Sequence, residues 1–372
     1  MKASEKSSRR THWILKIFLW INILDALLLI GAYVNTHISP NSIPYISFLG
    51  LGYPIILVIA LLFIIFWLFF KRKYALISII TILIGFNHFR HFYAITLSQS
   101  ELTNPVKVMS FNVHVFDVYN KQNRVENRNS IFSFLNDEQA DILCFQEYYH
   151  HENSNEFVTK DSMVKLLDLK YIHERYTHEM SGQRYFGVAT FSKYPIINKG
   201  EIPFANDNNN YCIYSDIKIN DDTVRVFNAH IGSIRFQSDD YDFFGDPNGP
   251  ISKSKETAGR RILGRIKQAF EKRAVQAEAV RRQIEASPFP VIVCGDLNDT
   301  PVSYSYRQFS ANLNDAFVES GNGVGQTYIG KVPSNRIDYI FHDPTMRSSN
   351  FTTHQVNLSD HKPISCLIEM PQ

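Results

Sequence analysis

The sequence predicts an α/β domain preceded by three transmembrane helices, and three observations lead to this fold class. Residues 1–98 carry nine Lys or Arg against two acidic residues, whereas the remaining chain carries 29 Lys or Arg against 34 acidic residues. Residues 26–70 contain no Asp, Glu, Lys or Arg at all. After residue 98, short β-branched or aromatic runs alternate with two longer helical patterns. We therefore expect a small membrane anchor (1–97) joined to a larger soluble domain, rather than a purely cytosolic protein.

The predicted anchor contains three apolar spans, at about 13–34, 45–70 and 74–97. Each reaches the roughly 20 residues that a helix needs to cross about 30 Å of hydrocarbon. Asp25 lies in the middle of the first span, so we expect it to face another helix. The third span ends in NHFRHFY, and its alternative is a shorter span followed by an interfacial helix. A cleavable signal peptide is disfavoured for the first span, because no small-residue cleavage site follows it.

Basic residues set the expected orientation of the anchor. Four Lys or Arg precede Trp13, the KRK turn at 71–73 separates the second and third spans, and the loop 35–44 has none. The positive-inside rule then places the N-terminus and the KRK turn in the cytoplasm. Three crossings of the cell (inner) membrane would leave the soluble domain outside the cytoplasm. An interfacial third segment would instead leave it inside.

The soluble domain is expected at 106–372, after a polar linker at 98–105 that ends in Asn-Pro. Its length suffices for one large core. Alternating runs such as 223–228 favour mostly antiparallel sheets with one covered face. Helical patterns occupy 124–136 and 260–286.

Polar side chains recur where the strand-like runs end. They are Asn112, Glu147, His230, Asp296, Asn298, Asp338, Asp360 and His361. Carboxylate and amide oxygens suit a hard cation such as Mg²⁺, which neutralises charge on phosphate oxygens. Histidines can donate hydrogen bonds to those oxygens, and an Asp can orient or deprotonate the attacking water. The set contains the groups that phosphodiester hydrolysis needs.

Each of these motifs alone is more often a turn or a strand cap, but their order carries more information. The series SFNV, QE, NAH, GDLN, RIDYIF and SDHKP resembles the endonuclease/exonuclease/phosphatase family over about residues 105–372. The NAH motif is similar to the N-T-H motif of deoxyribonuclease-like and sphingomyelinase-like members, so abasic-site endonucleases are disfavoured as relatives. The resemblance implies a four-layered α/β sandwich: two packed, mostly antiparallel sheets flanked by helices, with the site at one end.

The resemblance also implies a metal site. Glu147 would be the principal Mg²⁺ ligand, with Asn112 and Asp360 close to the metal and its waters. Mn²⁺ is the alternative cation. No His/Cys cluster indicates structural zinc.

Catalytic roles follow from the same resemblance. Asp296 would orient or activate the water, and Asn298 would hold a phosphate oxygen. His361 would stabilise the transition state, with Asp338 fixing its tautomer. His230 would be a further donor.

Some residues have a structural and a functional interpretation. Arg184, Tyr185 and Thr327 are more readily explained by packing than by substrate contact. The cysteines adjoin apolar runs and are expected as buried free thiols, although an even count permits disulfides. They are Cys144, Cys212, Cys294 and Cys366.

A long insertion at 231–290 begins with the turn-rich QSDDYDFFGDPNGP and continues as a basic helical stretch. Its interpretations are an amphipathic helix packed on the sheet, or a flap with a basic surface that faces anionic lipid or substrate.

The favoured function is a membrane-anchored, Mg²⁺-dependent phosphoesterase, with the lipid bilayer as partner and a lipid head group or other extracytoplasmic phosphodiester as substrate. The alternative is a surface-anchored nuclease that cleaves DNA or RNA, with nucleic acid as a substrate only. The mildly acidic soluble domain has no broad nucleic-acid footprint. The sequence indicates no protein partner.

Overall fold

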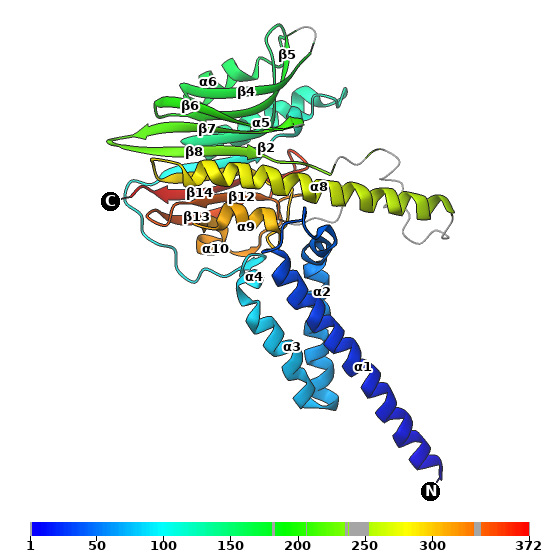
Figure 1. Cartoon of the computed structure of the whole chain (residues 1–372). Coiled ribbons are helices and arrows are strands. Elements are labelled where there is room, and N and C mark those ends of the chain that lie inside the picture. The colour runs from blue at the N-terminus through cyan, green and yellow to red at the C-terminus, as the bar shows by residue number, and fades with distance from the viewer. Residues whose placement is uncertain are drawn as a thin grey trace. The chain divides into compact units, whose positions relative to one another are not determined.

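The computed structural model describes residues 2–180, 183–205, 207–234, 237, 253–330 and 336–371; for 2–11 and 253–256 it describes the backbone alone. The chain divides into two compact units (Figure 1). One comprises Met1–Arg90 with Val302–Tyr304, and the other comprises His91–Pro301 with Ser305–Gln372.

The N-terminal unit is helical. Its elements are α1 (Lys2–Asn35), η1 (Pro44–Ile46), α2 (Ser47–Phe70), α3 (Arg72–Ile84) and α4 (Phe86–Arg90). The helices pack through apolar contacts and a few polar ones. Asn22 of α1 and Ser78 of α3 exchange side-chain hydrogen bonds at 2.9 and 3.1 Å, and Asp25 is buried.

Two stretches of this unit are long and apolar enough to cross a membrane, His12–Asn35 and Pro44–Phe70, with mean hydropathies of 2.1 and 2.8. Length and composition alone define these stretches, and a core helix or a signal sequence shares both properties. The predicted spans at 13–34 and 45–70 are therefore helices of suitable length.

The predicted third span at 74–97 is wrong as a single transmembrane helix. The 13 residues of α3 rise roughly 20 Å at about 1.5 Å per residue, short of the hydrocarbon thickness. Gly85 ends α3, and a Cβ there would lie only 1.9 Å from the ring of Tyr33. The polar residues beyond it form the short α4, and the chain then becomes extended at β1 (Tyr93–Ala94).

The second unit contains two mixed sheets, each with one parallel pair among antiparallel ones. In spatial order the first sheet contains β10 (Asn314–Asp315), β12 (Asp338–His342), β9 (Val291–Asp296), β8 (Asp222–His230), β7 (Asp207–Ile219) and β6 (Ile196–Phe204). The second contains β13 (Arg347–Thr353), β14 (Ile364–Glu369), β2 (Val106–Asn112), β3 (Ile142–His151), β5 (Arg184–Ser192) and β4 (Tyr171–Met180). A small sheet pairs β1 with β11 (Gly323–Val324).

Helices flank both sheets. They are η2 (His114–Asp117), α5 (Arg124–Glu138), α6 (Thr159–Leu167), α8 (Lys253–Glu285), α9 (Tyr304–Ser310) and α10 (Ala316–Ser320). The helical patterns predicted at 124–136 and 260–286 correspond to α5 and to most of α8.

Three apolar clusters build the layers of this unit. Between the sheets, Val108 and Ile142 of one pack with Val226 and Ile292 of the other. A second cluster joins α5 and α6 to the outer face of the second sheet, and a third joins α8 and α9 to the outer face of the first. The result is the expected order of helices, sheet, sheet and helices.

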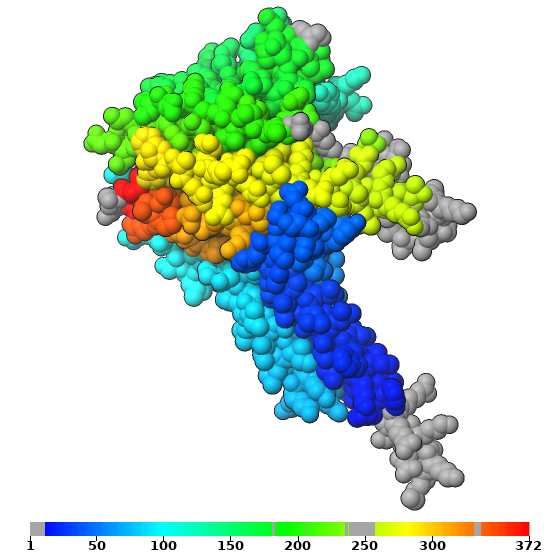
Figure 2. Space-filling view, viewed as in Figure 1, coloured from blue at the N-terminus to red at the C-terminus, as the bar shows by residue number. Residues whose placement is uncertain are grey.

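The insertion is described in part. Apart from Gln237, the segment QSDDYDFFGDPNGP lies outside the described residues. The following α8 lies along the surface of the unit (yellow in Figure 2) and packs on the sheet through Ala277 and Val280. Two of its basic residues are used internally, because Arg273 pairs with Asp299 at 3.1 Å and Lys272 pairs with Asp207.

All four cysteines are buried free thiols, as the apolar runs predicted. Within the second unit, residues before β2 are bonded to later parts of the chain. Gln99 donates to the carbonyl of Ser320 at 3.1 Å and accepts from the backbone of Asn350 at 2.9 Å.

Candidate active site

Parallel strand pairs bring the predicted residues to one end of the sheets. Asn112 ends β2 opposite Gln146 in the parallel β3, and His230 ends β8 opposite Asp296 in the parallel β9. Asp338 begins β12, which runs antiparallel to β9 and pairs with Asp296 at this same edge. The glycine of the CGD motif permits this approach, because a Cβ on Gly295 would meet the Ala229 carbonyl oxygen at 2.0 Å.

A bulge in β3 presents Glu147. The pairing with β5 shifts register between Phe145 and Tyr148, and Glu147 has a left-handed φ of 49°. Such a conformation costs a non-glycine residue about 1–3 kcal/mol and is characteristic of functional sites. Gln146 points into the protein, whereas the Glu147 side chain is 35% exposed.

Two buried amide side chains, Gln146 and Asn228, form hydrogen bonds beside the bulge. Gln146 donates to Asn228 of β8 at 2.8 Å, and Asn228 donates to the carbonyls of Phe145 and Ala189 at 3.1 and 3.0 Å. These contacts tie the two sheets together beneath Glu147. Sequence analysis missed both amides, although each is a letter of a motif that it used, QE and NAH.

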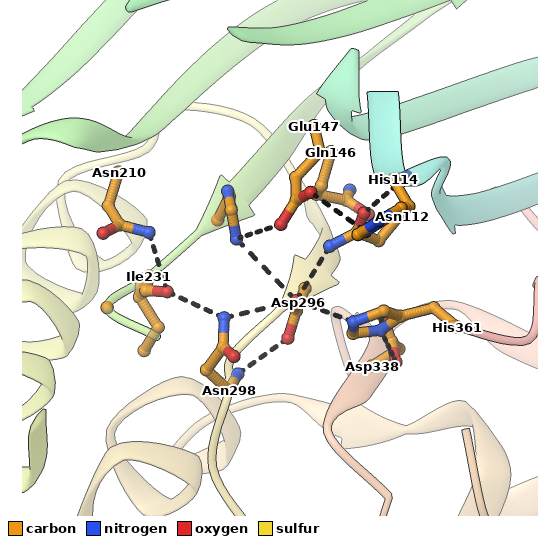
Figure 3. Close-up of polar contacts among 12 residues, drawn as sticks. Asn112, His114, Gln146, Glu147, Asn210, Ile231, Asp296, Asn298, Asp338 and His361 are labelled. Atoms are coloured by element: carbon orange, nitrogen blue, oxygen red, sulfur yellow. Dashed lines mark hydrogen bonds and ion pairs between the residues drawn. The ribbon is translucent and has the colours of Figure 1, made fainter. Parts of the chain in front are cut away.

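Asp296 is the centre of the site (Figure 3). It accepts from the Asn112 amide at 3.1 Å and from the Asn298 backbone at 2.8 Å, and it lies 3.8 and 3.7 Å from the Nε2 atoms of His230 and His361. Burial raises the pKa of this carboxyl to about 6; the charge of Asp338 adds to the rise, and the two histidines oppose it.

His361 and Asp338 form a buried pair. The Nδ1 of His361 lies 3.0 and 3.2 Å from the two oxygens of Asp338. Burial by itself would lower the pKa of this histidine, but the carboxylates of Asp338 and Asp296 outweigh it and raise the pKa to about 10. The Nε2 atom on the other side of the ring is turned toward Asp296.

Thr327 fixes the backbone around this pair. Its buried hydroxyl accepts from the backbone N–H groups of Ile337 and Asp338 at 3.0 and 3.1 Å. Its carbonyl accepts from the backbone N–H of Lys362 at 2.7 Å. Thr327 thus belongs to the support of the site, as its packing interpretation implied. Tyr185 instead stacks on His150 and Tyr176.

His114 joins the opposite side of the site and was missed by sequence analysis. Its Nδ1 lies 3.3 Å from Asp360 and 3.7 Å from Glu147. The bond to Asp360 is the main cause that raises the pKa of His114, against the effect of burial. Burial would raise the pKa of Asp360, but His114 and the neighbouring charges outweigh it and lower the pKa.

The structure therefore brings all eight predicted residues into one connected set. Asp296 contacts four of them directly, namely Asn112, Asn298, His230 and His361. Asp338 is reached through His361, and Glu147 is reached through His230. Asp360 is connected through His114 to Glu147.

One group of side chains in the described residues is compact enough to hold a metal ion through three ligand atoms. Asp296, Asp338 and His361 each offer an atom within 4.8 Å of the others, and all three are buried. They form a candidate divalent metal site. The ligands expected from the sequence adjoin this group: Asn112 donates to Asp296, and His114 lies between Glu147 and Asp360.

Comparisons with known proteins cover both units. A family model described as the Endonuclease/Exonuclease/phosphatase family matches residues 109–361, and a model described as a domain of unknown function (DUF8431) matches residues 15–92. No curated protein matches the chain.

Solved structures share the fold of the second unit. A family protein from Bacteroides thetaiotaomicron has a TM-score of 0.52 at 16% identity and covers 73% of this chain and 100% of its own. One from Leptotrichia buccalis has a TM-score of 0.50 at 18% identity, with 71% and 100% covered. The human Nocturnin catalytic domain with bound sulfate anion has a TM-score of 0.50 at 16% identity, with 73% and 97% covered. At these identities the likeness establishes the fold.

Proposed function

We propose that this chain, which belongs to the endonuclease/exonuclease/phosphatase family, is a membrane-anchored, Mg²⁺-dependent phosphodiesterase. The observation that carries the proposal is the convergence around Asp296. Two amide residues and two histidines from the two sheets contact one buried carboxylate, and the carboxylates of Asp338 and Glu147 contact the same histidines. Such a set supplies both a hard-cation site and donors for a phosphate.

The donor chemistry fits a divalent cation. His230 Nε2 is buried without a hydrogen-bond partner in the described part of the chain, and it lies 3.8 Å from Glu147 and 3.8 Å from Asp296. An unpaired donor between two carboxylates is where an anionic oxygen or a metal-bound water would be received. Glu147, Asp360 and Asn112 would hold the ion, which neutralises charge on the phosphate oxygens when bound.

We prefer Glu147, Asp360 and Asn112 as metal ligands over the compact group of Asp296, Asp338 and His361. His361 already directs Nδ1 to both oxygens of Asp338, so the two side chains are paired with each other. We therefore assign this pair to transition-state stabilisation rather than to metal binding. Mn²⁺ would occupy the same oxygen ligands.

The protein groups then divide the remaining work. Asp296 orients the attacking water, and His361 and His230 donate to developing negative charge on the phosphate. Both Nδ2 hydrogens of Asn298 are engaged, with the Ile231 carbonyl at 3.0 Å and Asp296 at 3.2 Å. Asn298 therefore positions Asp296 first, and it can hold a phosphate oxygen only by exchanging one of these bonds.

The test is a parallel assay of the purified full chain on bis-p-nitrophenyl phosphate, mixed-lipid liposomes and plasmid DNA, with and without EDTA. We expect EDTA-sensitive hydrolysis of the small diester and release of head groups from liposomes. The absence of EDTA-sensitive hydrolysis would overturn the proposal. Cleavage of plasmid at a comparable rate with no head-group release would establish the nuclease alternative.

Membrane anchoring is the part of the proposal that rests on the N-terminal unit. Two apolar helices support it, and α3 follows α2 after a single residue, Lys71, so the chain reverses direction at the KRK turn. With the basic ends in the cytoplasm, two crossings return the chain to the cytoplasm, and α3 is too short to complete a third, so this topology favours a catalytic domain inside. Protease added to intact spheroplasts should then leave that domain intact until lysis, whereas its digestion before lysis would require a third crossing and place it outside.

A further inference from the structure

An open pocket of about 490 Å³ adjoins the site. It is lined by residues of β3, β4, β5, β7 and β8 and by the segment around η2. Glu147 and His230 belong to its wall, so one end of the pocket is the place where the phosphate would bind. The volume falls in the range typical of small-molecule sites, about 300–1,000 Å³.

The unpaired nitrogen of His230 marks that end independently. The His230 residue is only 7% exposed, and its Nε2 has no hydrogen-bond partner among the described residues. A buried donor without a partner is costly unless a ligand or water completes it. The pocket therefore extends from His230 Nε2, where a substrate oxygen can bind.

The walls beyond this point are partly apolar. Val115, Tyr119, Met180, Phe186 and Val188 all line the pocket. Tyr119 is 70% exposed and Met180 is 45% exposed, so their side chains are accessible to a ligand. The aromatic and thioether groups provide apolar contact area of the kind that binds hydrocarbon or ring surfaces.

The charge of the lining excludes one class of occupant. Among the described lining residues none is Lys or Arg, and the one carboxylate is Glu147. The others are neutral hydroxyl or amide side chains, histidines and a glycine. A nucleic-acid strand or a polyphosphate would bring further phosphates into this pocket, whose described lining supplies no cation; Lys272, which reaches Asn210 of the lining at 3.5 Å, is already paired with Asp207.

We propose that this pocket binds an uncharged, partly apolar organic group attached directly to the scissile phosphate. The inference rests on the proposed function and narrows its substrate to phosphodiesters of uncharged alcohols. It places specificity in β4, β5 and the η2 segment, whereas the reaction itself is carried by the strand-end residues around Asp296.

Competitive inhibition by phosphomonoesters tests the pocket, because a monoester has one phosphate and one organic group. With bis-p-nitrophenyl phosphate as substrate, we expect phenyl phosphate to inhibit at a Ki on the order of tenfold below that of methyl phosphate. Thymidine 3′,5′-bisphosphate should inhibit no better than thymidine 5′-phosphate. Equal inhibition by phenyl and methyl phosphate, or a clear gain from the added phosphate, would overturn the inference.

A charge placed in the pocket provides the matched test. Met180→Lys should weaken inhibition by phenyl phosphate and strengthen inhibition by the bisphosphate, each on the order of tenfold. Ile197→Lys is the control, since Ile197 is also exposed (55%) but lies in β6 outside the lining. If both variants change the two Ki values equally, or if neither does, the pocket does not bind the organic group. If the unaltered protein shows no EDTA-sensitive hydrolysis, the proposed function itself is wrong.

Discussion

Asp296, Asp338 and His361 could bind a metal ion, or Asp338 and His361 could stabilise the transition state. Replacing Asp338 by Asn distinguishes these two roles. The substitution keeps the shape of the side chain but removes the charge that faces His361 Nδ1 at 3.0 Å. At an effective dielectric constant of 20, unit charges at this separation interact by roughly 5 kcal/mol, which is a ceiling for the loss. If the pair acts in the transition state, we expect kcat to fall by about 10²–10³, the usual cost of removing one charge-stabilising group.

The assay measures kcat with bis-p-nitrophenyl phosphate at saturating Mg²⁺, together with Mn²⁺ binding followed by electron paramagnetic resonance. Because Asp338 acts through His361, Asp338→Asn should have little further effect on kcat in a His361→Ala background. The Kd for Mn²⁺ should change less in Asp338→Asn than in Glu147→Gln.

Two results would refute this reasoning. If the rate losses of Asp338→Asn and His361→Ala multiply in the double variant, the residues act independently. If Asp338→Asn weakens Mn²⁺ binding as strongly as Glu147→Gln does, then Asp296, Asp338 and His361 are the metal site and the pair has been assigned wrongly.

Four further predictions follow from the same contacts. Glu147→Gln should abolish most Mn²⁺ binding and activity, whereas the exposed control Glu101→Gln should retain both; full activity of the first variant in EDTA would contradict the metal assignment. His230→Ala should lower kcat on the order of 10²-fold with a smaller change in KM, and a pure KM effect would remove it from the transition state. Thr327→Val removes the acceptor of one buried and one partly buried N–H group, at a cost of about 1–3 kcal/mol for the buried one, so it should lower both Tm and kcat. Thr327→Ser should restore them if the hydroxyl is responsible. The raised pKa of His361 means that the protonated ring stabilises the folded, metal-free protein below its unfolded pKa of about 6.5, and that this stability is lost as pH rises toward about 10; Tm in EDTA should fall over this window, and a slope unchanged in Asp338→Asn would show that the pair is not its source.

Apolar runs and helical periodicity predicted most of the long helices. Apolar runs and their lengths identified helices at 13–34 and 45–70, because hydropathy is a property of consecutive residues. The same criterion failed at 74–97, where composition was suitable but Gly85 and the polar residues after it end the helix. Helical periodicity located α5 and α8, whose apolar faces pack on the sheets.

The candidate site was also visible in the chain as an ordered set of strand-end motifs, and the structure joins the eight residues into one connected set of contacts. Sequence order alone indicates that such residues can converge, because parallel strands reach the same edge. It contains no information on which atoms pair. The bonds between Asp338 and His361, and between Asn112 and Asp296, join residues 23 and 184 positions apart.

Chain order by itself thus predicted the α/β class of the second unit, the two long apolar helices and the residues of the candidate site, since each follows from residue types along the chain. Only the tertiary structure decided the bulge that presents Glu147, the amide pair beneath it, the contacts of His114 and Thr327, and the pocket beside His230. These features depend on the register between strands and on the packing of one sheet against the other. A shift of one residue in that register would leave every motif in place along the chain and turn its side chains to the opposite face.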